Sequence, residues 1–380
     1  MAMATQSPGE EETIRIGAGL RMVLDWDNLV ARASDEGLAP FLYRRCRDLG
    51  LLTCIPARAR EFLRSSYRQT VLHNLYLLRF MEELDWVAGG RGLSVVVLKG
   101  AALLNSIYED VGLRPMEDID LMVRIEDLGL LKLLLEQMGF APDRFYPDTY
   151  KRGIIHVDLH TDFLSAHRIR SRRALIKIQP EKVWDRVEPV MEGANHLYRL
   201  SLYDNLIALS FHMLKHCFTR LIWFVDIKEI LIKQGVRFDW PGLAESARKM
   251  GGQRCLLYVL IMTKHLLGLN VPDDALRSFG RADLSIIEQY ILRIRLANEP
   301  VGRLSQLLCL FQIREASGRV RFVMESLFPR KSVMYQIFPA VSSCRSRPAY
   351  ARRTLDILLN GSLDLFLGAK AVFKGFLPKI

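Results

Sequence analysis

The sequence predicts an α+β fold in which a small mixed sheet lies between N-terminal helices and a large C-terminal helical region. Two observations predict this class. Strand-like and helix-like segments alternate over roughly 70 residues in the middle of the chain, which is typical of a small sheet domain. Before and after that stretch, the apolar residues follow the helical period. The chain of 380 residues is long enough to bury a large core.

The N-terminal part is predicted to be helical. Residues 1–12 are expected to be disordered, and helical spacing of apolar residues runs from Trp26 to about Thr70. Residues 71–88 have the pattern of a long amphipathic helix. Helix boundaries are expected at Pro40, at Pro56 and at Gly89–Gly90, since prolines and glycines mark helix ends.

The middle of the chain is expected to form the sheet. Predicted strands cover 93–98, 118–123, a stretch near Phe145 and 154–160, and predicted helices cover 100–108 and 126–138. From residue 201 to about 377 nearly all the spacing is helical. We therefore expect four parts: a disordered N-terminus (1–12), a helical region (13–90), an α/β core (91–200) and a helical region with a basic tail (201–380).

Positive charge is concentrated near the C-terminus, and this favours negatively charged binding partners. The net charge is +11, and residues 301–380 hold 13 Lys or Arg against 4 Asp or Glu. Such a basic surface attracts nucleotides, nucleic acid or anionic lipid without naming one of them, and nucleic acid is the less favoured partner here. The tail from 354 to 380 mixes apolar residues with lysines, so it either contacts an anionic membrane surface peripherally, docks a partner or packs on its own domain.

The location is predicted to be cytoplasmic. Six scattered cysteines without a CxxC pair indicate reduced thiols. The acidic N-terminus lacks the basic and then apolar layout of a signal peptide. No apolar run reaches the length of about 18 residues from which a membrane-spanning helix is inferred.

Two carboxylates at the start of a predicted strand suggest a metal site. The strand 93–98 runs into the turn Lys99-Gly100, and the next strand begins with Asp118 and Asp120. Residues i and i+2 of a strand point to the same face, so these two side chains project together. They repel each other unless a cation lies between them, and hard divalent cations prefer oxygen ligands. The pattern favours metal-dependent phosphoryl or nucleotidyl transfer.

A third carboxylate follows on a later strand. His156, Asp158 and His160 alternate with apolar residues, so they share one face of the strand 154–160. A third carboxylate near the first pair is what a two-metal site requires. The two histidines either bind metal, orient Asp158, act as general bases or lie at a polar edge.

The order of these motifs resembles the nucleotidyltransferase superfamily of DNA polymerase beta. More closely, the chain is similar to a bacterial family of uncharacterised nucleotidyltransferases, type 5. The similarity runs from about residue 20 to 235. It rests on ordered motifs, which are Asp25-Trp26, Ala39 to Tyr43, Val97 to Ala102, Leu113 to Val123, His156 to His160, and His212 to His216 followed by Trp223 and Asp226.

The resemblance implies roles for the residues of the turn and strands. Asp118, Asp120 and Asp158 would be the catalytic metal ligands, and Gly100 would let the backbone approach the triphosphate. The superfamily has serine after this glycine, whereas here Ala101 follows, so a hydroxyl that commonly contacts phosphate is missing. Lys99 and Arg114 are the candidates for phosphate contact instead. For Lys99 a structural ion pair, and for Arg114 stabilisation of its own loop, are the alternatives.

His212 and His216 lie four residues apart on one face of a predicted helix. That spacing can bind zinc, but no nearby Glu completes an HExxH motif. The family pattern implies instead that this helix lines the nucleotide cleft, with Asp226 on the next helix as a polar partner. Packing histidines that are satisfied by hydrogen bonds are the alternative.

The resemblance implies an enzyme that uses Mg²⁺ or Mn²⁺ to move a nucleoside monophosphate from a nucleoside triphosphate (NTP), such as ATP, to a hydroxyl. The acceptor is open among peptides, sugars and small molecules, and the family points to bacterial peptide-modification or exopolysaccharide-type gene clusters. One alternative is that the same scaffold transfers another group, a sugar or phosphate. Another is a degenerate module that binds a nucleotide, a peptide or RNA.

Overall fold

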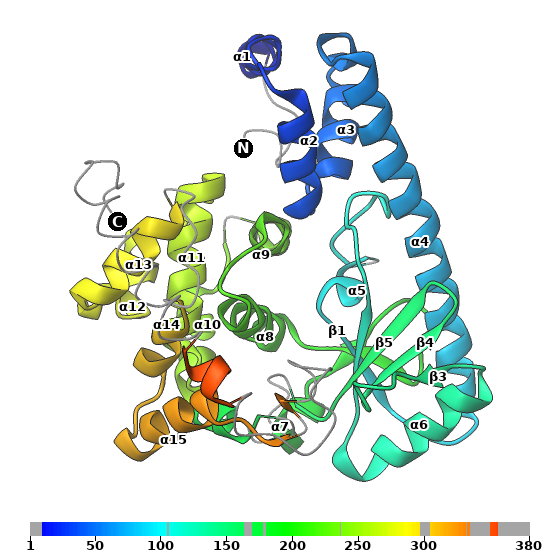
Figure 1. Ribbon diagram of the computed structural model, residues 1–380, viewed down its shortest axis with the longest axis vertical. Helices are drawn as coiled ribbons and strands as arrows, with labels where there is room; N and C mark the ends of the chain where they lie inside the picture. The colour runs from blue at the N-terminus through cyan, green and yellow to red at the C-terminus, as the bar shows by residue number, and fades with distance from the viewer. Residues whose placement is uncertain are drawn as a thin grey trace.

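The computed structural model describes residues 10–104, 106–162, 169–177, 180–235, 237–296, 305–331, 333–334 and 350–355. These residues form an α+β fold in which a seven-stranded mixed sheet lies between an N-terminal set of helices and a C-terminal set (Figure 1). The predicted fold class is confirmed. The division into four parts stays a prediction.

The N-terminal helices stand at one end of the molecule. They are α1 (Glu10–Arg21), α2 (Trp26–Asp35), α3 (Ala39–Asp48) and α4 (Ala57–Gly89), with a short 3₁₀ turn at Leu52–Cys54. Pro40 and Pro56 lie at the starts of helices and Gly90 caps the end of α4, so the helix boundaries predicted at these residues are confirmed. Two details differ from the expectation. Helix α1 begins at Glu10, within the stretch that was expected to be disordered, and α4 is one continuous helix that includes the stretch before residue 71.

The strand order of the sheet is β3-β4-β5-β2-β1-β7-β6. The strands are β1 (Val95–Leu98), β2 (Ile119–Met122), β3 (Ala141–Pro142), β4 (Thr149–Arg152), β5 (Ile155–His160), β6 (Glu188–Pro189) and β7 (Leu197–Arg199). Strand β2 is central, because it pairs with β1 on one side and runs parallel to β5 on the other. This position places the predicted Asp-x-Asp motif in the middle of the sheet.

Shorter elements connect the strands. They are α5 (Lys99–Leu103), a 3₁₀ turn (Ile125–Asp127), α6 (Leu128–Gln137), a second 3₁₀ turn (Arg170–Ala174) and α7 (Pro180–Trp184). Helix α5 is shorter than expected. The strand predicted near Phe145 is wrong: this residue lies in the turn between β3 and β4, where the Asp143 carboxylate accepts hydrogen bonds from the backbone N–H groups of Phe145 and Tyr146. Such a side-chain turn competes with strand pairing.

The two faces of the sheet pack against different helices. Side chains at alternating positions, such as Val97, Leu121 and Leu159, join an apolar cluster with α4 and α6. Leu98 and Met122 point to the opposite face and join the core of the C-terminal helices. Figure 1 shows α4 along the outer side of the sheet and α8 on the inner side. The side chains of Asp120 and Asp158 follow the second alternation, so they face α8.

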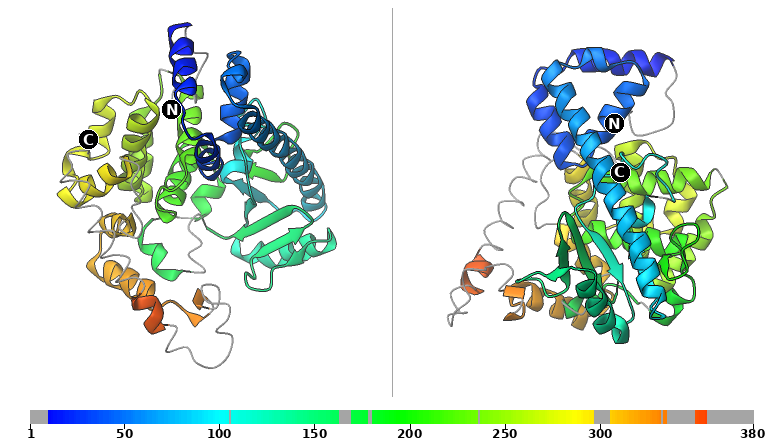
Figure 2. Two further views of the ribbon diagram at one scale, coloured as in Figure 1. Left: turned by 45° about the horizontal axis from the view of Figure 1, so that its top comes forward. Right: turned by 90° about the vertical axis from the view of Figure 1, so that its right-hand side faces the viewer.

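The C-terminal helices lie to one side of the sheet (Figure 2), and most residues of α11 are buried. These helices are α8 (Leu202–Lys215), α9 (Leu221–Gln234), α10 (Trp240–Met250), α11 (Gln253–Leu267), α12 (Asp273–Ser278), α13 (Ile286–Leu296), α14 (Ser305–Gln312) and α15 (Ala316–Leu327), with a 3₁₀ turn at Arg281–Asp283. Most of the basic tail, on which peripheral membrane contact was expected, lies outside the described residues. In the described part of the chain, no helix has the length and apolar character needed to cross a membrane.

Candidate functional site

The three predicted carboxylates lie on neighbouring strands. Asp120 of β2 is the direct register partner of Asp158 of β5, and these two strands are parallel. Asp118 lies two residues before Asp120 and directly precedes β2. Side chains in register on adjacent strands point to the same face. The register of β2 and β5, together with the strand period of two, therefore brings Asp158 to Asp120 and Asp118, which lie 38 and 40 positions before it in the sequence.

A polar triad forms around Asp120. One ligand atom each from Asp120, Asp158 and His160 lies within 4.8 Å of the other two. The Nε2 atom of His160 is 2.7 Å from Oδ1 of Asp120, and the hydroxyl of Thr149 donates a hydrogen bond to Asp158. Both carboxylates are thus held in place by neighbouring side chains. His160 was one of the residues whose role the sequence left open.

Lys99 forms an ion pair with Asp120, which was the structural alternative for this lysine. Leu98, the residue before Lys99, ends β1 directly opposite Asp120. The turn that follows therefore brings the Lys99 ammonium to the Asp120 carboxylate. The backbone of Lys99 has φ = 54°, a left-handed conformation that is uncommon for residues other than glycine. Such strain persists only where surrounding contacts hold it, and it clusters at functional sites.

The two neighbouring carboxyl groups have opposite pKa shifts. Burial raises the pKa of Asp118, and the Asp120 carboxylate adds to this, so that the pKa reaches about 7. Part of Asp118 reaches solvent, which screens some of the repulsion. Burial also acts to raise the pKa of Asp120, but the Lys99 ammonium and the hydrogen bond from His160 outweigh it and hold this pKa well below its ordinary value. Asp120 is therefore the fixed anion of the site.

Arg114 supports the loop that leads to these carboxylates. Its guanidinium binds Asp226 of α9, with Nε 2.8 Å from Oδ1 and Nη2 2.8 Å from Oδ2, and Nη1 donates to the carbonyl of Pro115. Tyr108 donates a further hydrogen bond to Asp226. These contacts agree with the alternative in which Arg114 stabilises its own loop. They also mean that the partners of Asp226 are Arg114 and Tyr108, and not His212 or His216.

Gly100 packs against this loop. A Cβ atom at position 100 would lie 3.0 Å from Sδ of Met116 and 3.2 Å from Cζ of Arg114. Both distances are tight for a side-chain contact, so the absence of a side chain lets α5 and the loop approach each other. The next residue, Ala101, is buried in the apolar cluster on the α4 side of the sheet.

Two histidines and a tryptophan form an aromatic group on α8 and α9. The ring of Trp223 is 4.8 Å from that of His212 and 5.7 Å from that of His216, measured between ring centroids. Burial and the charge of Lys99 hold the pKa of His212 well below its ordinary value. Burial and the charge of Lys215 lower the pKa of His216 to about 3, although part of this residue reaches solvent. Both rings are therefore neutral near pH 7.

One cavity of about 550 Å³ contains all eight residues that the sequence selected. Its lining includes Lys99, Gly100, Arg114, Asp118, Asp120, Asp158, His212 and His216. Five cationic side chains and four carboxyl groups line it, so opposite charges are interleaved. Its volume lies within the range of about 300–1,000 Å³ that is typical of small-molecule sites.

Several further lining residues had no assigned role in the sequence. Arg172, Lys215 and Arg220 add positive charge to the cavity, and Trp223 adds an aromatic face. Trp223 belonged to a motif that carried the family resemblance, which was a usable signal. Lys215 lies within the same motif and Arg220 follows it by five residues, whereas Arg172 comes from a separate segment that only the folded chain brings to the cavity.

Comparison with known proteins supports the same interpretation. The chain matches the family described as "Uncharacterised nucleotidyltransferase" over residues 23–268, which includes helices α2 to α4, the sheet and the helices through α11. No curated protein and no solved structure gives a significant match. The matched stretch covers well over half of the chain and contains every candidate site residue. The chain therefore belongs to this family of uncharacterised nucleotidyltransferases.

Proposed function

We propose that the protein uses a divalent metal ion to transfer a nucleoside monophosphate from an NTP to a hydroxyl group of an acceptor. The observation that carries this proposal is that Asp118, Asp120 and Asp158 line the same cavity as basic and aromatic side chains. Carboxylates suit a metal ion, cations suit a triphosphate and aromatic rings suit a base. The family supports a nucleotide as substrate.

The donor groups fit Mg²⁺ or Mn²⁺. Carboxylate oxygens are the preferred protein ligands of both ions, and Mg²⁺ is often held by one or two carboxylates together with substrate phosphates. The candidate ligands are Asp118, Asp120 and Asp158. His160 lies against Asp120 and suits the role of orienting that carboxylate, since such contacts fix metal ligands in place. A bound ion would supply charge neutralisation and an activated attacking oxygen.

The remaining lining suits the two ends of a nucleotide. Arg220 offers positive charge for the triphosphate. Trp223 and His212 offer a neutral aromatic surface, and bases stack on such surfaces whatever their identity. Lys99 joins the phosphate contacts once a metal ion replaces its ammonium beside Asp120.

The proposed reaction is a substitution at the α-phosphorus of the NTP. The acceptor oxygen forms a bond to the α-phosphorus, the bond from that phosphorus to the pyrophosphate breaks, and the hydroxyl proton is released. Positioning and electrostatic stabilisation supply most of the catalysis in phosphoryl transfer. The chain's own part is to hold the carboxylates rigidly, orient the triphosphate and enclose the base.

The test has two stages. Calorimetry with each NTP in the presence of Mg²⁺ or Mn²⁺ measures metal-dependent nucleotide binding without an acceptor. Incubation with a pool of peptides, sugars and hydroxylated metabolites, followed by mass spectrometry, then measures transfer. We expect a mass gain of one nucleoside monophosphate on the acceptor. A gain of a hexose or of phosphate alone would overturn the proposed reaction.

Matched variants connect the signal to the site. Asp120→Asn and Asp158→Asn keep the size of each side chain and remove its charge, and we expect both to lose transfer. Asp185→Asn, an exposed residue outside the cavity lining, is the control and should retain full activity. If the two cavity variants were as active as the control, the site assignment would be wrong. If no NTP bound in the presence of either ion, the protein would be a binding module for another ligand.

A further inference from the structure

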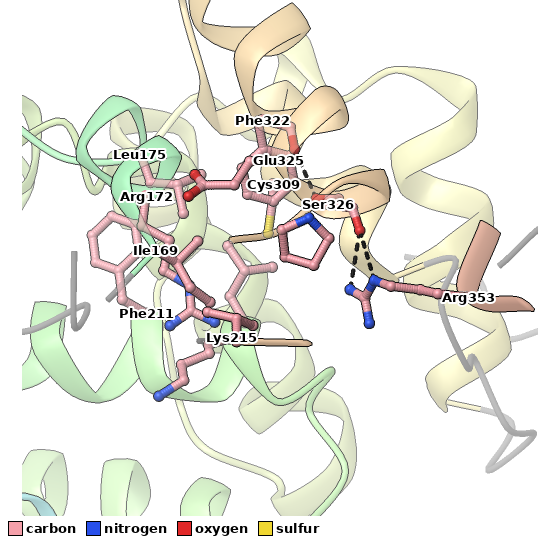
Figure 3. Close-up of a pocket in the computed structure, with 13 residues that line it drawn as sticks. Ile169, Arg172, Leu175, Phe211, Lys215, Cys309, Phe322, Glu325, Ser326 and Arg353 are labelled. Carbon is pink, nitrogen blue, oxygen red and sulfur yellow. Dashed lines mark hydrogen bonds between the residues drawn. The ribbon is translucent and has the colours of Figure 1, made fainter. Parts of the chain in front are cut away.

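A second, smaller cavity opens beside the large one. Its volume is about 130 Å³, and it lies between α8, α14, α15 and the 3₁₀ turn Arg170–Ala174 (Figure 3). Ile169, Arg172 and Lys215 line both cavities. The two cavities are therefore adjacent, with these three side chains at their common boundary.

The inner lining of the small cavity is apolar. It is formed mainly by Leu175, Phe211, Leu214, Cys309, Phe322 and Val333. An engineered cavity of about 150 Å³ with a similar lining stays dry and binds benzene, so a cavity of this size suits one apolar group of that size. A phenyl ring or a branched aliphatic side chain meets the requirement, whereas a whole nucleotide does not.

The rim of the small cavity is positively charged. Arg172, Lys215 and Arg353 contribute cations and Glu325 the single carboxylate. That carboxylate already accepts hydrogen bonds from the backbone N–H groups of Arg170 and Ser171, at 3.2 and 2.6 Å. Figure 3 shows Arg172 and Lys215 on one side of the cavity, with Ser326 and Arg353 on the other. The rim therefore complements an anion.

We propose that the small cavity binds the apolar group of the acceptor, and that the acceptor is an amphipathic anion. It carries a phenyl or branched aliphatic group close to a negatively charged group, which lies at Arg172 and Lys215, and its hydroxyl extends into the large cavity. The ligand's role as acceptor rests on the proposed function, but its binding to the small cavity does not depend on any reaction. The two statements are therefore separable by experiment.

The test uses small probes and no catalysis. Phenylacetate has the ring and the charge, phenylacetamide has the ring alone, and acetate has the charge alone. Ligand-observed NMR on the full-length protein measures the affinity of each probe. We expect phenylacetate to bind at least about tenfold more tightly than either of the other two, since each of these lacks one of the two complementary features.

A filling variant locates the binding. Ser326 lines the small cavity on α15, and Ser326→Phe should place a ring in it and abolish phenylacetate binding. Met324→Phe adds a similar ring to the same helix at an exposed position outside the lining, and it should bind as the wild type does. Equal binding by both variants, or equal affinity for phenylacetate and phenylacetamide, would overturn the proposal.

A second variant covers the case in which Ser326→Phe does not fold. Phe322→Ala enlarges the cavity, and it should shift the preference from phenylacetate to the larger 1-naphthylacetate. An unchanged preference would count against the proposal. Nucleotide binding with Mg²⁺ is measured on the same samples. Nucleotide binding without probe binding overturns this inference alone, whereas probe binding without nucleotide binding overturns the proposed function and leaves the cavity as a site for an amphipathic anion.

Discussion

Arg114 and Asp226 form a two-pronged ion pair in the interior, although they lie 112 positions apart in the sequence. Arg114 belongs to the loop that leads to Asp118, and Asp226 belongs to α9. The pair thus joins the sheet to the helices on the opposite side of the cavity. Planar, paired hydrogen bonds of this kind fix orientation as well as distance.

Breaking this pair should destabilise the whole protein. Arg114→Met leaves the buried Asp226 carboxylate without its cation, and removal of one partner of a buried pair costs about 3–5 kcal/mol of unfolding free energy. The double variant Arg114→Met/Asp226→Asn should recover part of this loss, because the unpaired charge is gone. Urea unfolding measures both. Arg199→Met, which breaks the more exposed pair with Glu188, is the control and should cost less than about 1 kcal/mol.

Removing the Lys99 ammonium should strengthen metal binding. In Lys99→Met the ammonium no longer competes with a divalent ion for the Asp120 carboxylate, and a unit charge about 4 Å away is worth about 1 kcal/mol in water and about 4 kcal/mol near a protein surface. We expect Mn²⁺ to bind about tenfold more tightly by calorimetry, while nucleotide transfer falls. Lys132→Met, which removes a lysine from a pair with Asp148, should change neither value. Weaker Mn²⁺ binding in Lys99→Met would contradict the expectation.

A methyl group at Gly100 should disturb the site loop. Its nearest neighbours would be Met116, which is flexible, and Arg114, which Asp226 holds in place. Overpacking of this kind typically costs about 1–3 kcal/mol, so Gly100→Ala should be less stable and less active. Gly129→Ala in α6 has open space around the new methyl group and should be neutral or slightly stabilising. Equal melting temperatures for the two variants would disprove the close approach.

Loss of the indole should weaken nucleotide binding without a preference for one base. Stacking of a base on an aromatic side chain is worth about 1–3 kcal/mol, so Trp223→Leu should bind NTPs about tenfold to a hundredfold more weakly. Calorimetry with all four NTPs checks both the size and the uniformity of the loss. Trp86→Leu removes a tryptophan that is 82 % exposed on α4 and should leave binding unchanged. A loss confined to one base would indicate hydrogen-bond readout instead.

The pH dependence of stability should report on Glu288. Burial acts to raise the pKa of this carboxyl group, but hydrogen bonds from Arg254, Tyr258 and Ser285 outweigh it and lower the pKa. A lowered pKa in the folded state means that the stabilising effect is present above the ordinary glutamate pKa of about 4.3 and is lost as pH falls through the folded value.

Glu288→Gln should therefore be less stable than the wild type at pH 7, and the gap should narrow as the pH is lowered from about 5 to about 3. Urea unfolding at a series of pH values measures the gap. A gap that widens on acidification would mean that the folded protein favours the protonated carboxyl group. Glu192→Gln, at an exposed position, serves as the control and should follow the wild type.

The parts of the site that follow a short-range rule were predictable from the sequence. The alternation of strand side chains is enough to put Asp118 with Asp120, and Asp158 with His160, on single faces. The apolar run at 93–98 and the glycine pair after residue 88 mark the ends of elements. Each of these features depends on residues within a few positions of one another.

Contacts across the fold were not predictable in the same way. The sequence left Lys99 open between phosphate and an ion pair; the ion pair arises because β1 ends directly opposite Asp120, and phosphate contact stays a prediction. Arg114 was open between phosphate and its own loop; its partner in the structure is a carboxylate on α9, and phosphate contact stays a prediction. Side-chain partners depend on register and helix docking, which no local spacing encodes. The wrong strand near Phe145 has a similar origin, since a single carboxylate, that of Asp143, shapes the turn.

The central position of β2 has a consequence for how the protein loses its function. The backbone of Asp120 lies in a strand that is paired on both edges, so its amide hydrogen exchanges with solvent only when the sheet itself opens. Asp120 therefore lies in a more protected part of the molecule than the helix ends. Local fraying of the helical ends leaves Asp120 opposite Asp158, so the geometry of this pair is lost only when the central strands separate.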